Sequence, residues 1–565
     1  MLPSQISEMN VVLGGEAGQG LQTIGLVLAR AFLAGGLHVM VVNEFMSRIR
    51  GGSNSVTLRA AVQPVRAFSE RIDCCILFDH DALARLRGRC AEGTVLIGDP
   101  KIFGESAGML PLPLHELSTP VGGALYANSV VCGFLVRLLG WELVVLETAL
   151  RRIFSEDGRL DKNLAAARIG WEYGAELHGR FPLLRGAALS DRLLLDGSQS
   201  VALGALAGGC TFISSYPMSP ATGVLVHLAK QARDHGVVVE QAEDEISAIN
   251  MGLGAWYAGA RALVSTSGGG FDLMAEGLSL CGAIESPLVI HLAQRPGPGT
   301  GLPTRTEQGD LEIARYSGHG EFPRAILAPG SLEEAFACAA HAFTMADASQ
   351  SPVIVLTDQY LLDSLCDLDP FPLPSTAPAS RIVTTTEDYQ RYAPGPGPDS
   401  VSPRGIPGFG QGLVCVDSDE HDAKGRITED FATRTTMVDK RLAKARLLEE
   451  ELALPPRLHG PADYRRLLVG WGSTAPAIIE ALARVPLEQT AFLHCVQVYP
   501  LPAALVAHLR RAERIIVIEN NATGQFARLL RAETGCVVAT EWRKYNGLAF
   551  SIEEIIALLR EEGKR

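Results

Sequence analysis

Short apolar runs and stretches with helical spacing alternate through the first part of the chain. Asn10–Leu13 is an apolar run typical of a buried strand, and a glycine-rich loop leads from it into Leu21–Leu33, where apolar residues recur at helical spacing. Further strands are predicted at His38–Val42, Cys74–Phe78 and Thr94–Ile97. Strands that alternate with helices are typical of a parallel, doubly wound sheet. We therefore predict an α/β domain over residues 1–186.

The same alternation returns in the middle of the chain. Strands are predicted at Thr211–Ser214, Ala262–Ser265, Leu288–Leu292 and Val353–Leu356, and helices at Glu245–Tyr257 and Leu332–Met345. Residues 197–229 lack Asp, Glu, Lys and Arg, but they are rich in glycine, hydroxyl-bearing residues and proline. That content favours a buried strand, turn and helix over a membrane-spanning helix. We predict a second α/β domain over residues 187–375 and no membrane segment.

The pattern changes again in the last third of the chain. Residues 393–398 are an alanine followed by alternating proline and glycine, which excludes a helix or a central strand, whereas Thr435–Leu452 has the spacing of a charged amphipathic helix. We predict a connector over residues 376–460 and a third α/β domain over residues 461–565. Strands of this last domain are predicted at Leu467–Val469 and Ile515–Ile518. The predicted fold class is α/β with three domains.

The net charge and the cysteine pattern exclude several classes of function. The 565 residues include 50 Lys and Arg against 63 Asp and Glu, a net charge of −13, whereas a general nucleic-acid binder carries a basic surface. None of the 11 cysteines forms a Cys-x-x-Cys pair, so we expect neither a cysteine-ligated iron–sulfur cluster nor a structural zinc, and no metal ligands are assigned. The scattered cysteines and an N-terminus without a basic start before an apolar run predict a cytoplasmic protein.

The first domain contains a glycine loop between a strand and a helix. Gly15, Gly18 and Gly20 would let backbone N–H groups approach a phosphate at the helix N-terminus. Their spacing is the reverse of the dinucleotide fingerprint, but Glu44 ends the second predicted strand, so a nicotinamide cofactor remains an alternative. A tight turn without any ligand is the other alternative.

A second loop in this domain combines a basic side chain with a flexible turn. Arg50, Gly51 and Gly52 lie in a hydroxyl-bearing segment, and a guanidinium beside free N–H groups suits phosphate or pyrophosphate. A solvated basic turn is the alternative.

Four segments of the second domain place polar chemistry after predicted strands. Two prolines fix the turn in Tyr216–Thr222, Glu240–Glu245 holds four carboxylates at a helix start, and Ser265–Gly270 is a hydroxyl-lined glycine turn. Arg295 ends another strand, where it could clamp a carboxylate. Glycines 9 and 14 residues after Glu245 would let that helix and its exit pack tightly. A rigid loop, a solvated helix start and a surface ion pair are the alternatives.

Together these segments resemble the α subunit of 2-oxoacid:ferredoxin oxidoreductases, most closely the 2-oxoglutarate type with a γ domain fused in front. The first domain is similar to the γ domain, the second to the domain that binds the pyrimidine of thiamine diphosphate, and the third to the C-terminal domain of transketolase. Further blocks that carry the resemblance are residues 299–304, 308–311, 319–324, 419–422 and 520–525.

The resemblance implies a role for several residues. Glu245 would hydrogen-bond the aminopyrimidine of thiamine diphosphate and favour the imino tautomer that generates the ylide. Ser219 stands where the family has a substrate-contacting Thr, and Arg295 where it has an Arg that grips the 2-oxoacid carboxylate. Residues implied to line the cofactors are Thr266, Ser267 and Gly268 for thiamine diphosphate, and Arg50, Gly51 and Gly52 for coenzyme A (CoA).

The chain also departs from the family. Met218, Ser219 and Ala221 replace the usual Ile, Thr and Ser, which puts side-chain selectivity in doubt, and residues 197–200 lack the frequent Asn-Glu-Ala. No Gly-Asp-Gly followed by a downstream Asn is present, so the diphosphate and Mg²⁺ site is missing. The resemblance therefore implies a β subunit that brings this site and a [4Fe–4S] cluster, an (αβ)₂ assembly, and ferredoxin as electron acceptor.

The implied reaction is the CoA-dependent oxidative decarboxylation of 2-oxoglutarate to succinyl-CoA. Pyruvate, branched-chain and aryl 2-oxoacids are alternative substrates. A second basic group would bind the distal carboxylate of 2-oxoglutarate, and Arg305 and His319 are candidates. A non-catalytic scaffold and a stand-alone nicotinamide enzyme are alternatives from other classes.

Overall fold

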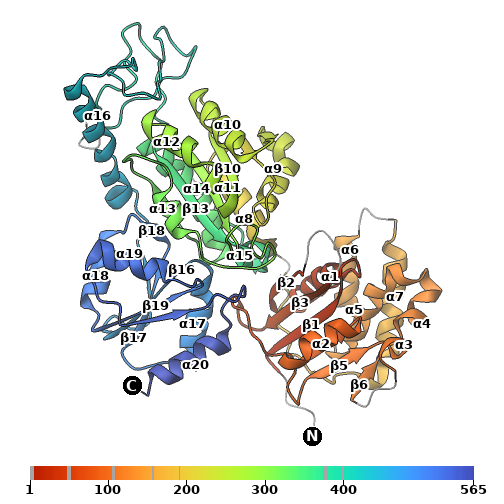
Figure 1. Cartoon of the computed structure of the whole chain (residues 1–565). Helices are drawn as coiled ribbons and strands as arrows, with labels where there is room; N and C mark the ends of the chain where they lie inside the picture. The colour runs from red at the N-terminus through yellow and green to blue at the C-terminus, as the bar shows by residue number, and fades with distance from the viewer. Residues whose placement is uncertain are drawn as a thin grey trace. The chain divides into compact units, whose positions relative to one another are not determined.

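The structure, a computed structural model, describes residues 6–46, 52–104, 108–154, 158–189, 191–372, 380–395, 397 and 400–564. It divides into two compact units, whose helices and strands are labelled in Figure 1. The first unit spans Met1–Leu195, Asp363–Pro370 and Ser551–Glu554, and the second spans Asp196–Leu362, Phe371–Phe550 and Ile555–Arg565.

In the described part of the chain, the sheet of the first unit has eight strands in the order β6-β5-β4-β1-β3-β2-β14-β7. The strands are β1 (Glu8–Glu16), β2 (His38–Glu44), β3 (Ser53–Ala61), β4 (Cys74–Leu77), β5 (Val95–Gly98), β6 (Met109–Pro111), β7 (Leu193–Asp196) and β14 (Leu365–Leu368). The prediction of a parallel sheet is wrong, because β3 runs antiparallel to both β1 and β2, and β14 runs antiparallel to β2.

The apolar pattern misses β3 because polar residues interrupt it. Its Ser, Asn, Thr and Arg side chains are buried all the same, and Arg59 pairs with Glu8 at 2.9 Å and donates to the carbonyl of Ala67. Buried polar groups of this kind depend on partners from distant strands and loops. Local spacing therefore does not reveal the strand.

Helices α1 (Leu21–Ala34), α5 (Ala127–Leu138), α6 (Leu143–Ile153) and α7 (Leu160–Tyr173) share the main core of the first unit, where the Phe32 and Trp141 rings meet edge to face at 5.8 Å. Shorter helices are α2 (His80–Leu86), α3 (Pro100–Phe103) and α4 (Leu114–Ser118). Among the described residues, no single helix is long and apolar enough to cross a membrane. The two helical segments Leu114–Val121 and Ala124–Leu138, which are joined by a sharp bend, reach that length and apolarity only when they are taken together.

The larger sheet of the second unit has the order β18-β12-β13-β11-β10-β8-β9 within the described residues. Its strands are β8 (Phe212–Ser215), β9 (Val238–Gln241), β10 (Ala262–Ser267), β11 (Leu288–Gln294), β12 (Ala325–Leu327), β13 (Pro352–Asp358) and β18 (Gln497–Tyr499). Every pair of neighbouring strands in this sheet is parallel except the pair β12 and β18, which is antiparallel. The four strands predicted here are confirmed, with ends shifted by one or two residues.

The helices around this sheet are α8 (Gly197–Ala207), α9 (Thr222–His235), α10 (Glu245–Tyr257), α11 (Gly268–Leu273), α12 (Ala275–Ala283), α13 (Leu311–Tyr316), α14 (Leu332–Ser349) and α15 (Gln359–Asp363). The uncharged segment 197–229 begins with a helix instead of the predicted strand. Asp196 and Gln199 form a capping box at the start of α8, and Gly197 and Gly204 approach the backbone of neighbouring segments too closely for any side chain.

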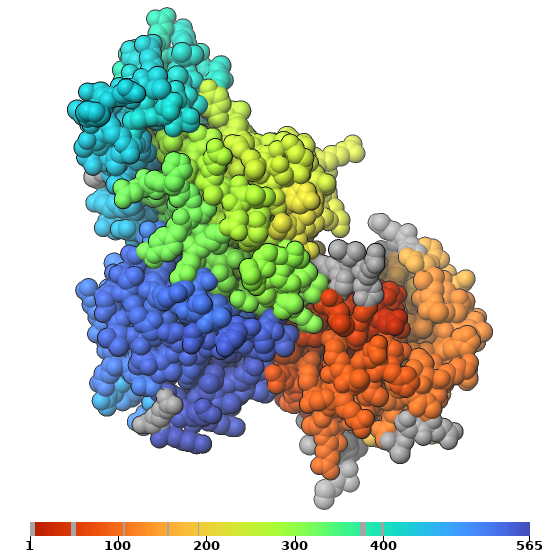
Figure 2. Space-filling model, in the orientation of Figure 1, coloured from red at the N-terminus to blue at the C-terminus, as the bar shows by residue number. Residues whose placement is uncertain are grey.

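The C-terminal sheet has the order β15-β17-β16-β19-β20 within the described residues. Its elements are β15 (Arg457–His459), β16 (Arg466–Trp471), α17 (Ala475–Arg484), β17 (Thr490–Cys495), α18 (Ala503–Arg511), β19 (Arg514–Glu519), α19 (Gln525–Thr534), β20 (Thr540–Arg543) and α20 (Ile552–Glu562). In Figure 1 the green sheet of the second unit lies beside helix α16 of the connector, which leads down to this blue region, and in Figure 2 green atoms border both the cyan and the blue ones. These sheets confirm a multidomain α/β fold, and the domain boundaries stay predictions.

The connector is held by a buried ionic cluster. Helix α16 (Phe431–Ala443) begins before the predicted Thr435 and gives way to a π-helical turn at Leu447–Glu451. Lys440 and Lys444 reach the Glu285 carboxylate at 2.7 and 3.1 Å, and Arg391 donates to the Glu285 carbonyl at 2.7 Å. All four side chains are buried, so the cluster joins the connector to the loop before β11.

Candidate active site

Three predicted site segments meet at one edge of the second unit's larger sheet. Strands β8, β10 and β11 are neighbours and run parallel, so their carboxyl ends lie at the same edge. Ser219 follows β8, Gly268 follows β10 and Arg295 follows β11. In open α/β sheets, ligands bind at this edge.

Glu245 is the first residue of α10 and is almost fully buried, with 3% of its surface exposed. Its Oε1 atom has no hydrogen-bond partner among the described residues. Burial raises the pKa of Glu245, and the nearby Asp244 carboxylate raises it further. The residue's own backbone N–H lowers the pKa, but by less than burial raises it. A buried carboxyl oxygen without a partner is a candidate ligand-binding group.

The structure gives Glu245 and its neighbour Glu243 different surroundings. Glu243 is exposed and accepts a hydrogen bond from the Ser247 hydroxyl at 2.8 Å, so it stabilises the helix start. The packing role predicted for the following glycines holds for Gly259, which has φ 95° and lies against Ile406. A Cβ on Gly254 would meet no atom of the described chain within 4 Å, and its predicted packing near a neighbouring subunit stays a prediction; within the chain, the close approach is made by Gly252 against Val264.

The glycine turn after β10 lies directly against the Glu245 carboxyl. A Cβ on Gly270 would come within 2.4 Å of Glu245 Oε1 and 2.3 Å of Thr266 Oγ1. Thr266 and Ser267 are fully buried, and the Ser267 hydroxyl has no partner among the described residues. The structure therefore brings Glu245, Thr266, Ser267 and the Gly268 turn together, with two polar groups left for a ligand.

Arg295 is oriented by the turn that contains Ser219. Its Nη1 group donates to the main-chain carbonyl of Ser219 at 2.8 Å, so the contact does not use the Ser219 hydroxyl. Burial lowers the pKa of Arg295, and the Asp310 carboxylate opposes that shift. No carboxylate lies within 4 Å of this guanidinium among the described residues, which leaves donors for an anionic ligand.

Asp310 is a site residue to which sequence reasoning assigned no role. A Cβ on Gly268 would lie 2.6 Å from Asp310 Oδ2, so this carboxyl lies against the same turn as Glu245. Oδ2 has no partner among the described residues, and the backbone N–H of Asp310 donates to Gln294 Oε1 at 3.0 Å. The only signal in the sequence was its place in the 308–311 block.

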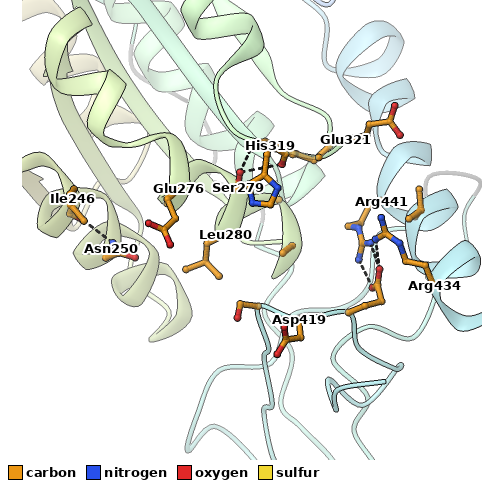
Figure 3. Close-up of a pocket in the computed structure, with 18 residues that line it drawn as sticks. Ile246, Asn250, Glu276, Ser279, Leu280, His319, Glu321, Asp419, Arg434 and Arg441 are labelled. Atoms are coloured by element: carbon orange, nitrogen blue, oxygen red, sulfur yellow. Dashed lines mark hydrogen bonds and ion pairs between the residues drawn. The ribbon is translucent and has the colours of Figure 1, made fainter. Parts of the chain in front are cut away.

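A cavity of about 630 Å³ lies beside the start of α10. Figure 3 shows Ile246 and Asn250 on one side and Arg434 and Arg441 of α16 on the other, with His319 between them. Arg441 binds the Glu420 carboxylate at 2.8 Å. His319 lines this cavity, and the Arg305 side chain lies against Gly547; both stay candidates for the distal carboxylate.

The predicted CoA residues belong to the first unit. Arg50 and Gly51 lie outside the described residues. Gly52 precedes β3 with φ 129°, and its carbonyl accepts from the Ala17 N–H at 3.3 Å, so the two predicted phosphate loops touch. Across the described residues, no three His, Cys, Asp or Glu side chains are grouped to hold a metal ion, and every cysteine is free.

Two family models match the chain. Residues 203–440 match the thiamine-diphosphate-binding region of pyruvate flavodoxin/ferredoxin oxidoreductases, and residues 10–173 match the pyruvate ferredoxin/flavodoxin oxidoreductase family. The first match contains Glu245, Arg295 and Asp310, and the second contains both glycine loops.

Similar proteins cover almost the whole chain. The α subunit of 2-oxoacid:ferredoxin oxidoreductase 2 from Aeropyrum pernix is 30% identical over 99% of this chain and 98% of its own length. The 2-oxoglutarate oxidoreductase subunit KorA from Mycobacterium tuberculosis is 33% identical over 77% of this chain and 68% of its own. The structure of 2-oxoglutarate:ferredoxin oxidoreductase from Magnetococcus marinus, with 2-oxoglutarate, coenzyme A and succinyl-CoA bound, superposes with a TM-score of 0.91 at 28% identity, covering 99% of this chain and 100% of that one.

Proposed function

Because the chain belongs to the family of 2-oxoacid:ferredoxin oxidoreductase α subunits, we propose that its substrate is 2-oxoglutarate, which is decarboxylated and oxidised with CoA to succinyl-CoA and CO₂ while ferredoxin is reduced. The observation that carries the proposal is the buried carboxyl of Glu245, whose Oε1 atom has no partner among the described residues, against a glycine turn one strand away from Arg295. The Magnetococcus enzyme, named for 2-oxoglutarate, supports this choice of substrate.

The residues fit the aminopyrimidine half of thiamine diphosphate. Glu245 Oε1 and the Ser267 hydroxyl are buried and have no partners in the described part of the chain, and the space at Gly270 would be filled by any side chain. Glu245 would hold a proton at its carboxyl oxygen, opposite a ring nitrogen, and Thr266, Ser267 and Gly268 would line the ring. When bound, the cofactor supplies the electron sink for decarboxylation.

Arg295 would bind the substrate carboxylate. Its guanidinium is half-buried and already oriented by the Ser219 carbonyl, so little freedom is lost when a carboxylate binds. The Ser219 hydroxyl has no role in that orientation and stays a candidate substrate contact. Arg305 and His319 remain candidates for the distal carboxylate.

The proposal includes partners that complete the enzyme. A β subunit would bring the diphosphate and Mg²⁺ site and a [4Fe–4S] cluster, in an (αβ)₂ assembly that transfers electrons to ferredoxin. The name "subunit alpha" of the relatives supports a complex of several chains. For CoA, we propose Arg50, Gly51 and Gly52; the hydrogen bond from the Ala17 N–H to the Gly52 carbonyl supports a phosphate site shared with the first glycine loop.

The first experiment is anaerobic co-purification of this chain with a β chain, followed by CoA-dependent dye reduction with 2-oxoglutarate, pyruvate and 2-oxoisovalerate. We expect the highest kcat/KM with 2-oxoglutarate. A preference for another acid would reassign the substrate within the family. Activity with none of them, despite bound thiamine diphosphate, would place the substrate outside this panel.

Arg295→Lys is expected to raise the KM for the oxoacid by about tenfold or more, because lysine keeps the charge but loses the two-pronged donor. The measurement is steady-state kinetics of the assembled complex. Arg528→Lys is the control, since that guanidinium is about half exposed and pairs with Glu312. An unchanged KM in Arg295→Lys would remove Arg295 from the substrate site.

A further inference from the structure

Asp310 occupies the N-cap position of α13 but does not cap it. Aspartate at this position normally accepts a hydrogen bond from an N–H of the first turn. Here the side chain makes no capping bond, and its carboxyl lies instead against Gly268, where a Cβ would stand 2.6 and 2.7 Å from the two oxygens. The carboxyl therefore faces the glycine turn of the active site, opposite Glu245 at Gly270.

The charges around Asp310 favour its neutral form. Glu307 lies in the same loop, with its Oε1 atom turned back towards Gly309, and Asp272 comes from α11. Burial raises the pKa of Asp310 to about 7, Glu307 and Asp272 add to the rise, and Arg295 alone opposes it. Glu245, from α10, is the other ionisable group on this turn.

Arg295 and Asp310 interact electrostatically, and each shifts the pKa of the other. One of its N–H groups is used by the Ser219 carbonyl, and no carboxylate pairs with it within 4 Å among the described residues. Asp310 therefore acts on Arg295 through space, without closing an ion pair. An ionised Asp310 would offset the positive charge that attracts a carboxylate, and a protonated Asp310 would not.

We propose that Asp310 is a positioning residue whose protonation sets the affinity of Arg295 for the substrate carboxylate. On binding of the oxoacid anion, Asp310 takes one proton from solvent onto a carboxyl oxygen, and no other bond changes. The inference rests on the proposed function, because it takes Arg295 as the carboxylate-binding group. Affinity for the acid should fall as the pH rises through neutrality, since the ionised form then has to be protonated for binding.

The test is calorimetric titration of the assembled complex with 2-oxoglutarate, in buffers of different ionisation enthalpy. The Glu245→Gln background is used so that the acid is bound but not consumed. We expect uptake of about one proton per acid bound at pH 8 and much less at pH 6. Adding Asp310→Asn should abolish the uptake, whereas adding Asp272→Asn, at an exposed site on α11, should retain it.

A second measurement uses the active complex. The KM for 2-oxoglutarate should rise about tenfold per pH unit above neutrality, and Asp310→Asn should flatten this rise, with the effect on KM and not on kcat. If Asp310→Asn fails to assemble, Glu307→Gln serves instead. Loss of that like charge should lower the pKa of Asp310, so the rise in KM should begin at lower pH and the KM at a given pH near neutrality should be higher.

The outcomes separate this inference from the proposed function. Binding without proton uptake, or uptake that survives Asp310→Asn, contradicts the role of Asp310 and leaves the proposed function standing. Absence of any binding of 2-oxoglutarate or the other oxoacids contradicts the proposed function and, with it, this inference.

Discussion

Glu245→Gln is expected to reduce oxoacid-dependent dye reduction by the assembled complex by about a thousandfold or more, with little change in melting temperature. Proton transfer by a positioned side chain contributes roughly 10²–10⁴-fold in enzymes, and glutamine keeps the shape of glutamate but cannot hold the proton. The Oε1 atom has no protein partner among the described residues, so the substitution breaks no internal hydrogen bond of that atom. The measurement is kcat with saturating substrate, thiamine diphosphate and CoA.

Glu243→Gln is the matched control for this prediction. It makes the same chemical change two residues earlier, at an exposed side chain that only accepts from Ser247. We expect kcat close to that of the unmodified complex. Equal losses in both variants, or a Glu245→Gln complex that turns over at the normal rate, would contradict the assignment of Glu245.

Glu285→Gln is expected to cost about 3–5 kcal/mol in the free energy of unfolding of the second unit, because it leaves Lys440 and Lys444 buried without an anion. Urea titration of the purified chain, followed by fluorescence, measures the loss as a lower midpoint of the transition that involves α16. Glu450→Gln is the control: its ion pair with Arg446 is exposed, and a shift within about 0.5 kcal/mol is expected.

The same cluster predicts a loss of stability in acid. Burial alone would raise the pKa of Glu285, but Lys444, Lys440 and Arg391 outweigh it and lower the pKa to about 2. The ionised form thus stabilises the fold fully above the usual pKa of 4.5, and this contribution disappears as the pH falls from 4.5 towards 2. Glu285→Gln should flatten the part of the acid-unfolding curve in that range. An acid dependence identical in both proteins would contradict this role for the cluster.

Regular apolar spacing predicted much of the fold. Helix α10 has the bounds predicted from the sequence, Glu245–Tyr257, and the strands that precede Ser219, Gly268 and Arg295 lie where the apolar runs placed them. The errors occur where pairing is not local. Strand β3 enters the sheet antiparallel with a polar sequence, and α16 starts at Phe431 because Asp430 caps it.

The sequence by itself determined the local setting of the residues that we propose for the chemistry: Glu245 at a helix start, hydroxyls and glycines after a strand, and Arg295 at a strand end. Those signals are local, because helix caps, turns and strand ends are set by neighbours along the chain. Only the tertiary structure decided that Asp310 turns from its own helix to Gly268, and that Glu285 is buried against Lys440, 155 residues away. Such contacts depend on which distant segments pack together and which charges are then removed from water, and spacing along the chain does not record either.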